Sequence, residues 1–90
     1  MNDLFKAIIK ADLTTIKELL KSGTDVNIKG FQGYTPIQIA ISWRNEAVIT
    51  ELYNAGANVL LINDHGRNAI DCAREYKNHF AMYLFKGKHA

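Results

Sequence analysis

The chain has 90 residues, which allows one domain at most, because a single domain typically has about 100–150 residues. A hydrophobic fraction of 48% and a charged fraction of 22% are typical of a folded globular protein and exclude a disordered segment. Eleven Lys and Arg against nine Asp and Glu give a net charge of +2, far below the excess that marks a dedicated nucleic-acid or membrane-surface protein.

Cysteine content and hydropathy exclude further classes. The lone Cys72 excludes a disulfide within the chain and a zinc site made of several cysteines. No stretch approaches about 18 apolar residues, so no membrane-spanning helix is predicted. The N-terminal MNDLFKAIIKADL has acidic residues on both sides of its apolar ones and no small-residue cleavage site, unlike a secretion signal. We therefore expect a soluble cytoplasmic protein that needs no cofactor and has no membrane partner.

A 33-residue repeat runs through the chain. At this offset glycines align with glycines and apolar residues align with apolar residues. A shift of 33 positions aligns Gly23 with Gly56 and Gly33 with Gly66. The aligned apolar sets are Leu4/Ile37/Ile70, Ala7/Ala40/Ala73, Ile16/Ile49/Met82 and Leu19/Leu52/Phe85. Such self-similarity at one fixed offset is typical of stacked repeat architectures.

The first unit predicts helices over residues 4–11 and 13–22. Asp12, in the turn between them, is well placed to cap the second helix, and Gly23 supplies the left-handed residue that ends it. A loop over residues 24–33 follows.

The middle unit has the same plan with clearer boundaries. Thr35-Pro36 opens a helix, because Pro costs nothing at the first helical position. Its buried side is predicted to hold Ile37, Ile39, Ala40 and Ile41. Trp43-Arg44-Asn45 interrupts the apolar run, a second helix follows to Ala55-Gly56, and a loop over residues 57–66 has a turn at its tip. The last unit predicts helices from Asn68 to Arg74 and from about Asn78 to Lys86.

These units resemble the ankyrin repeat, which reads roughly G-x-T-P-L-H-x-A and then L-L-x-x-G-A-D/N. The matching segments are Gly33-Tyr34-Thr35-Pro36-Ile37-Gln38-Ile39-Ala40, Leu52-Tyr53-Asn54-Ala55-Gly56-Ala57-Asn58 and Leu19-Leu20-Lys21-Ser22-Gly23-Thr24-Asp25-Val26-Asn27. The resemblance implies an all-α ankyrin-repeat solenoid of three helix-turn-helix pairs joined by two β-hairpin-like loops. The implied repeats are about 1–32, 33–65 and 66–90, in a single ankyrin-repeat domain.

Two departures from the family pattern stand out. Gln38 and Asp71 occupy the position of the family's histidine, so we expect its hydrogen bonds between repeats to be only partly kept. The first unit lacks the opening turn, which suits an end repeat. We interpret the chain as a complete miniature solenoid, and the sequence alone leaves open that it is a fragment.

No residue pattern supports catalysis or metal binding. Cys72 follows Ile39 by one repeat, so a small buried thiol is favoured over a nucleophile. A metal site made of His65, Cys72, His79 and His89 would need ligands from separate elements. No phosphate-binding glycine motif and no Gly-x-Ser-x-Gly motif is present. We expect no enzyme, no metal and no cofactor.

The C-terminal end offers an alternative of another class, weak nucleic-acid binding. Residues 1–66 carry six basic and seven acidic groups (net −1), and residues 67–90 carry five and two (net +3). The basic residues are Arg67, Arg74, Lys77, Lys86 and Lys88, and the nearby aromatic ones are Tyr76, Phe80 and Tyr83. An excess of three charges favours a solvated face over a nucleic-acid site.

The resemblance implies a partner-binding surface on the loop tips and on the exposed ends of the first helices, which line a concave face. In the two later units these positions are Lys29, Phe31, Gln32, Tyr34, Ser42, Trp43, Ile62, Asp64, His65, Arg67, Glu75 and Tyr76, and in the first unit Ile9 and Lys10. An exposed aromatic cluster concentrates binding energy. Packing of Trp43 or Tyr34 between repeats is the alternative that the sequence leaves open.

The resemblance therefore implies a protein–protein interaction module that acts by binding alone. We expect a chain that is monomeric when free and that acts as a stoichiometric inhibitor, an immunity protein or an adaptor. A host-directed viral or bacterial effector adaptor is the alternative role.

Overall fold

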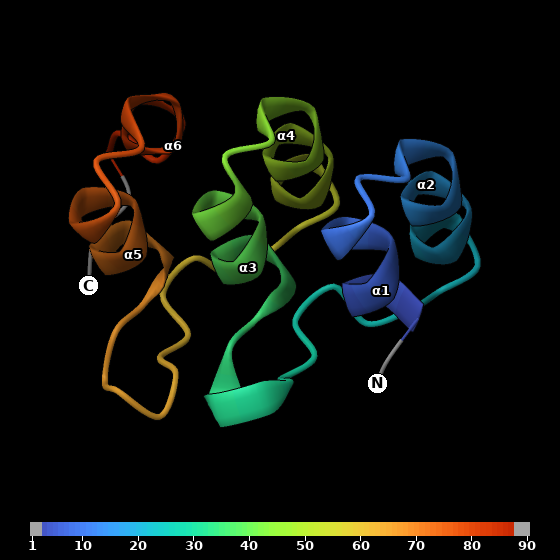
Figure 1. Ribbon diagram of the computed structural model, residues 1–90, viewed down its shortest axis with the longest axis horizontal. Helices are drawn as coiled ribbons and strands as arrows, with labels where there is room; N and C mark the ends of the chain where they lie inside the picture. Colours follow the sequence, from blue (N-terminus) through green and yellow to red (C-terminus); the bar gives the residue numbers. More distant parts are fainter. Residues whose placement is uncertain (1–2, 88–90) are drawn as a thin grey trace.

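The computed structural model describes residues 3–87, and these form six α-helices in three consecutive pairs (Figure 1). The pairs are α1 (Asp3–Ile9) with α2 (Leu13–Lys21), α3 (Pro36–Trp43) with α4 (Glu46–Asn54), and α5 (Ala69–Glu75) with α6 (His79–Leu84). A short 3₁₀ turn, η1 (Phe31–Gly33), lies in the first loop, and the described residues contain no β-strand. The predicted all-α solenoid of three helix pairs is confirmed.

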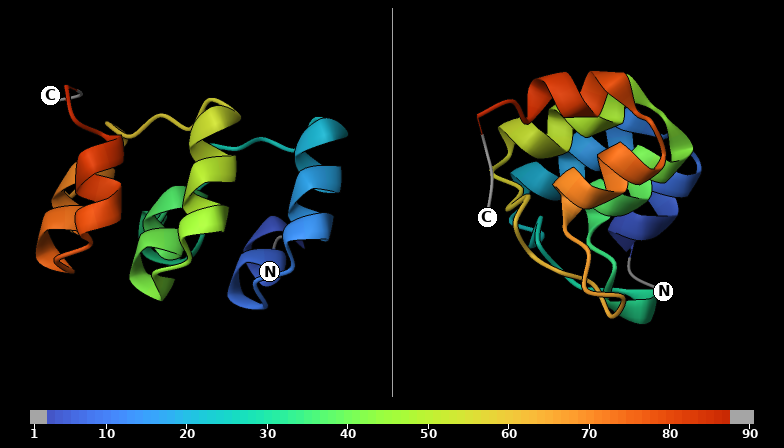
Figure 2. Two further views of the ribbon diagram at one scale, coloured as in Figure 1. Left: turned by 90° about the horizontal axis from the view of Figure 1, so that it is seen from above. Right: turned by 90° about the vertical axis from the view of Figure 1, so that its left-hand side faces the viewer.

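The helices stand in two rows, with α1, α3 and α5 in one and α2, α4 and α6 in the other (Figures 1 and 2). Within each row, every helix packs against its neighbours. Ala7, Ala40 and Ala73 occupy the same register position and are all buried, at 4% exposure or less. Small residues at these places let the first-row helices approach closely, and the core then runs without a break through the three pairs.

The turn within each pair repeats one local geometry. Its left-handed residue is Ala11, Arg44 or Lys77, with φ between 54° and 59°. The next residue is Asp12, Asn45 or Asn78, whose side chain accepts a hydrogen bond from the backbone N–H three residues on, at 3.0–3.1 Å. These caps satisfy N–H groups that the first turn of a helix leaves free. The predicted cap at Asp12 is thus present and recurs in the other two pairs.

The two loops project from the same side of the solenoid and lie against each other (Figure 2). Each closes on itself in a hairpin-like way, through Gly30 N–H to the Tyr34 carbonyl and Asn63 N–H to the Arg67 carbonyl, both at 2.9 Å. Between the loops, the backbone N–H of Asp64 donates to the carbonyl of Gln32 at 2.9 Å. The loops therefore form one continuous backbone surface rather than two independent tips.

Gln38 joins the second loop to the helices. Its side chain is fully buried; Nε2 donates to the carbonyls of Leu61 at 2.9 Å and Arg67 at 3.3 Å. Its Oε1 accepts from Thr35 N–H and from Nδ2 of Asn63, both at 3.3 Å. Leu61, Asn63 and Thr35 belong to the same repeat as Gln38 and Arg67 belongs to the next, so one of these bonds crosses between repeats.

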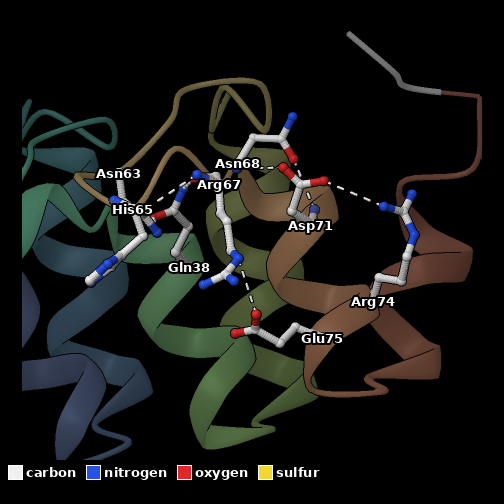
Figure 3. Close-up of polar contacts among 8 residues, drawn as sticks. All are labelled: Gln38, Asn63, His65, Arg67, Asn68, Asp71, Arg74 and Glu75. Atoms are coloured by element: carbon white, nitrogen blue, oxygen red, sulfur yellow. Dashed lines mark hydrogen bonds and ion pairs between the residues drawn. The ribbon is translucent and has the colours of Figure 1, made fainter.

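Asp71, at the same register position, makes local contacts only. Its Oδ2 accepts from the Asn68 N–H at 3.0 Å, and its Oδ1 lies 3.4 Å from Nη1 of Arg74 (Figure 3). Both partners belong to the same helix or its cap. The contacts of the Asp71 side chain therefore stay within its own repeat.

Gly33 and Gly66 provide a matched pair for testing how tightly the loops pack. Both have left-handed backbones, with φ of 74° and 75°. A Cβ on Gly33 would lie 2.6 Å from Oδ1 of Asp64 and 3.0 Å from the backbone N of Asp64. A Cβ on Gly66 would have nothing within 4 Å. Gly66→Ala is expected to lower the free energy of unfolding by about 1 kcal/mol through backbone strain. Gly33→Ala should cost roughly 1–2 kcal/mol more, because it also separates the loops. Equal losses in urea denaturation would contradict this packing.

Candidate functional site

A groove of about 480 Å³ opens between the first-row helices and the first loop. The lining residues are Phe5, Ile9, Lys29, Gly30, Phe31, Tyr34, Ile39, Ser42 and Tyr76. Aliphatic and aromatic side chains dominate this lining, and Lys29 is its one charged residue. Such a volume, with mostly apolar walls and a few polar groups, is typical of a binding site.

The structure divides the predicted partner-binding residues into two groups. Those that line the groove are Lys29, Phe31, Tyr34, Ser42 and Tyr76, together with Ile9 of the first unit. Those outside the groove are Gln32, Trp43, Ile62, Asp64, His65, Arg67 and Glu75, and all of these are exposed, as is Lys10.

The predicted aromatic residues of this region differ in their exposure to solvent. Phe31 is 83% exposed and Trp43 is 58% exposed, whereas Tyr34 and Tyr76 are half-buried. Trp43 is therefore not packed between repeats. The alternative that the sequence leaves open is wrong for this residue. Tyr34 is held edge-on against the ring of His65, with centroids 6.0 Å apart.

Four of the residues outside the groove interact with each other in two pairs. Nε2 of His65 lies 3.2 Å from Oε1 of Gln32. Nε of Arg67 lies 3.1 Å from Oε2 of Glu75 (Figure 3). This exposed ion pair neutralises both of its members, and exposed pairs contribute little to stability.

Sequence reasoning missed three lining residues, Phe5, Gly30 and Ile39. Ile39 was expected in the core, but it is half-buried and faces the groove, because it lies at the edge of the buried side of α3. Phe5 is only 6% exposed, and a Cβ on Gly30 would lie 2.8 Å from its ring. The absence of a side chain at Gly30 thus lets the ring pack directly on the loop backbone.

The repeat register contains the signal that would have found Phe5 and Gly30. Phe5 is one repeat before Gln38, and Gly30 is one repeat before Asn63. Gln38 and Asn63 are joined by a side-chain hydrogen bond under the second loop. Under the first loop an aromatic ring and a glycine replace this polar pair, and the base of the groove is apolar as a result.

Burial shapes the electrostatics of the groove. Desolvation raises the pKa of the Tyr34 hydroxyl, and nearby Tyr76 adds to the effect. The Tyr34 phenol is therefore neutral at pH 7 and able to donate a hydrogen bond. The Ser42 hydroxyl is used locally, since Oγ donates to the carbonyl of Ile39 at 2.7 Å.

Cys72, in α5, is a buried, unreactive thiol. Desolvation, with smaller contributions from Glu75 and Asp71, raises its pKa from 9.0 to about 11. The folded state holds this proton more tightly than the unfolded chain, so the group stabilises the fold below pH 9 and loses its contribution as the pH rises through 11.

A pH series of unfolding experiments tests this assignment. The free energy of unfolding of the wild type is expected to fall by roughly 2 kcal/mol more between pH 9 and 11 than that of Cys72→Ala. The variant corrects for effects of pH that arise elsewhere in the molecule. Parallel curves for the two proteins would show that the thiol is not desolvated.

The alternative sites for metal and nucleic acid gain no support from the described residues. Between residues 3 and 87 no three His, Cys, Asp or Glu side chains come together as metal ligands; His89 lies outside this range. Of the basic C-terminal residues, Arg67 and Arg74 are paired with carboxylates, and Lys88 lies outside the described residues. Within residues 3–87 no helix is long and apolar enough to cross a membrane.

Comparison with known proteins agrees with the fold. A family model of ankyrin repeats in three copies matches residues 4–90, so the chain belongs to the ankyrin-repeat family, whose repeats are protein–protein interaction modules.

Several curated proteins are similar to the chain. It is 33% identical over 72 residues to protein phosphatase 1 regulatory subunit 12A of Mus musculus, covering 80% of the chain and 7% of that protein. It is 30% identical over 78 residues to regulatory protein NPR3 of Arabidopsis thaliana, covering 86% and 13%. It is 36% identical over 64 residues to mouse ankyrin repeat, SAM and basic leucine zipper domain-containing protein 1, covering 70% and 14%. The chain thus spans a small part of the length of these relatives.

Proposed function

We propose that the protein binds another protein in the groove and on the adjoining loop tips, and that binding alone is its activity. The observation that carries this proposal is the exposed apolar surface around the groove, where Phe31 is 83%, Trp43 is 58% and Ile9 is 42% exposed. Large exposed aromatic side chains reduce solubility and, in interfaces, supply most of the binding energy. A partner that covers them gains this energy without remodelling the core.

The polar groups of the groove favour binding over catalysis. Ser42 is hydrogen-bonded to a helix carbonyl, and no His or carboxylate lines the groove beside it to take up its proton. A role as a stoichiometric inhibitor, an immunity protein or an adaptor in the cytoplasm fits such a surface. A host-directed viral or bacterial effector adaptor would use it in the same way. We propose that the chain is monomeric until it meets its partner.

Affinity capture from the cells that encode the protein tests the proposal. The immobilised chain is compared as wild type, as Phe31→Ala/Trp43→Ala, and as the control Tyr83→Ala. Tyr83 is 78% exposed on α6, in the other row of helices, so its variant removes a similar amount of exposed aromatic surface elsewhere. We expect a protein that the wild type and the control retain and the double variant loses. A partner retained by all three would place binding away from the groove.

A further inference from the structure

We infer that the groove binds a partner segment with bulky apolar side chains next to an acidic residue, whose carboxylate meets Lys29. This inference rests on the proposed function and specifies the chemistry of the partner. It joins two features of the lining: the apolar base of the groove and the single positive charge at its edge.

The apolar part of the lining fits bulky side chains. Buried Phe5 and half-buried Ile39 contribute its deeper surface, while exposed Ile9 and Phe31 contribute its rims. The Phe5 ring packs directly on Gly30 at this base. Aromatic and aliphatic groups inserted between such walls bury area against surfaces that are already fixed.

The charge at the groove is positive and is not neutralised by an acidic side chain. Within residues 3–87 the ion pairs are Arg67–Glu75 and Arg74–Asp71, so neither involves Lys29. Nζ of Lys29 donates to the carbonyl of Ile62 at 2.8 Å, which fixes the ammonium between the two loops.

An acidic group therefore complements this end of the groove. An ammonium has three N–H donors, so Lys29 retains two for a ligand. A carboxylate binds here with a charge-assisted hydrogen bond, whereas a basic segment meets uncompensated repulsion.

A randomised dodecapeptide library displayed on phage is the probe. It is selected on the wild-type protein and counter-selected on Phe31→Ala. The selected peptides, called winners below, are expected to combine bulky apolar residues with Asp or Glu. For one synthetic winner, Lys29→Met is expected to lower affinity roughly five- to tenfold, while Lys17→Met, at an exposed site on α2, leaves it unchanged. Thermal unfolding by circular dichroism confirms that both variants fold.

The same peptide with its acidic residue replaced by the amide completes a double-mutant cycle. If the carboxylate meets Lys29, the loss caused by Lys29→Met disappears with the amide peptide. Additive losses, or winners without acidic residues, would overturn the inference, although groove-dependent binding would leave the proposed function in place. Failure to recover any peptide that survives the counter-selection on Phe31→Ala would also overturn it. The proposed function itself fails only if the captured partner is indifferent to the groove variants.

Discussion

Replacing Gln38 with alanine is expected to lower the free energy of unfolding by about 3 kcal/mol. The substitution removes the Gln38 partner of the Leu61 carbonyl and of the Asn63 amide, while the Arg67 carbonyl keeps its bond from the Asn63 N–H. The side chain is fully buried, so water does not replace these bonds without rearrangement. Because a domain of this size is stable by only about 5–15 kcal/mol, the second loop should loosen well before the helices unfold.

Urea denaturation followed by circular dichroism measures this loss. Gln32→Ala is the matched control, since Gln32 is an exposed glutamine at a loop tip and should change stability by no more than about 0.5 kcal/mol. Similar stabilities for the two variants would mean that the network under the second loop does not join it to the helices.

Phe31→Ala is expected to weaken binding of the captured partner by about 2 kcal/mol, roughly 30-fold in Kd. The side chain is 83% exposed, so its removal costs the fold little and the loss falls on the complex. Trp43→Ala is expected to have an effect of similar size with little loss of helicity, because Trp43 is also exposed at the end of α3.

Isothermal titration calorimetry of the purified pair checks both values. Tyr83→Ala serves as the control and should bind like the wild type. Unfolding of the Trp43 variant would show that this side chain supports the core, and unchanged affinity in both variants would move the interface away from the first loop.

The fold could be predicted because its determinants are local and recur every 33 residues. Ala7, Ala40 and Ala73 are buried at one register position, and Asp12 caps α2 as its place after the turn indicates. The exact helix ends differ by one to two residues, since a helix end depends on the geometry of its last turn as well as on residue type.

The groove could be predicted only in part, because its base depends on contacts between elements. The loop residue Phe31 was found by its position in the repeat, but Phe5 and Gly30 matter through their contact with each other. Likewise, nothing local in the sequence indicates that Lys29 reaches the carbonyl of Ile62 in the next loop. The signal that would reveal the apolar base is a comparison of residues at the same register position, such as apolar Phe5 and polar Gln38.

Site-specific photo-crosslinking tests the central claim most directly. Benzoylphenylalanine replaces either Phe31, at the rim of the groove, or Tyr83, on α6, and each protein is irradiated with the purified partner. Binding through the groove predicts a covalent adduct from position 31 and none from position 83. An adduct from position 83 alone would contradict the account and place the partner on the other row of helices.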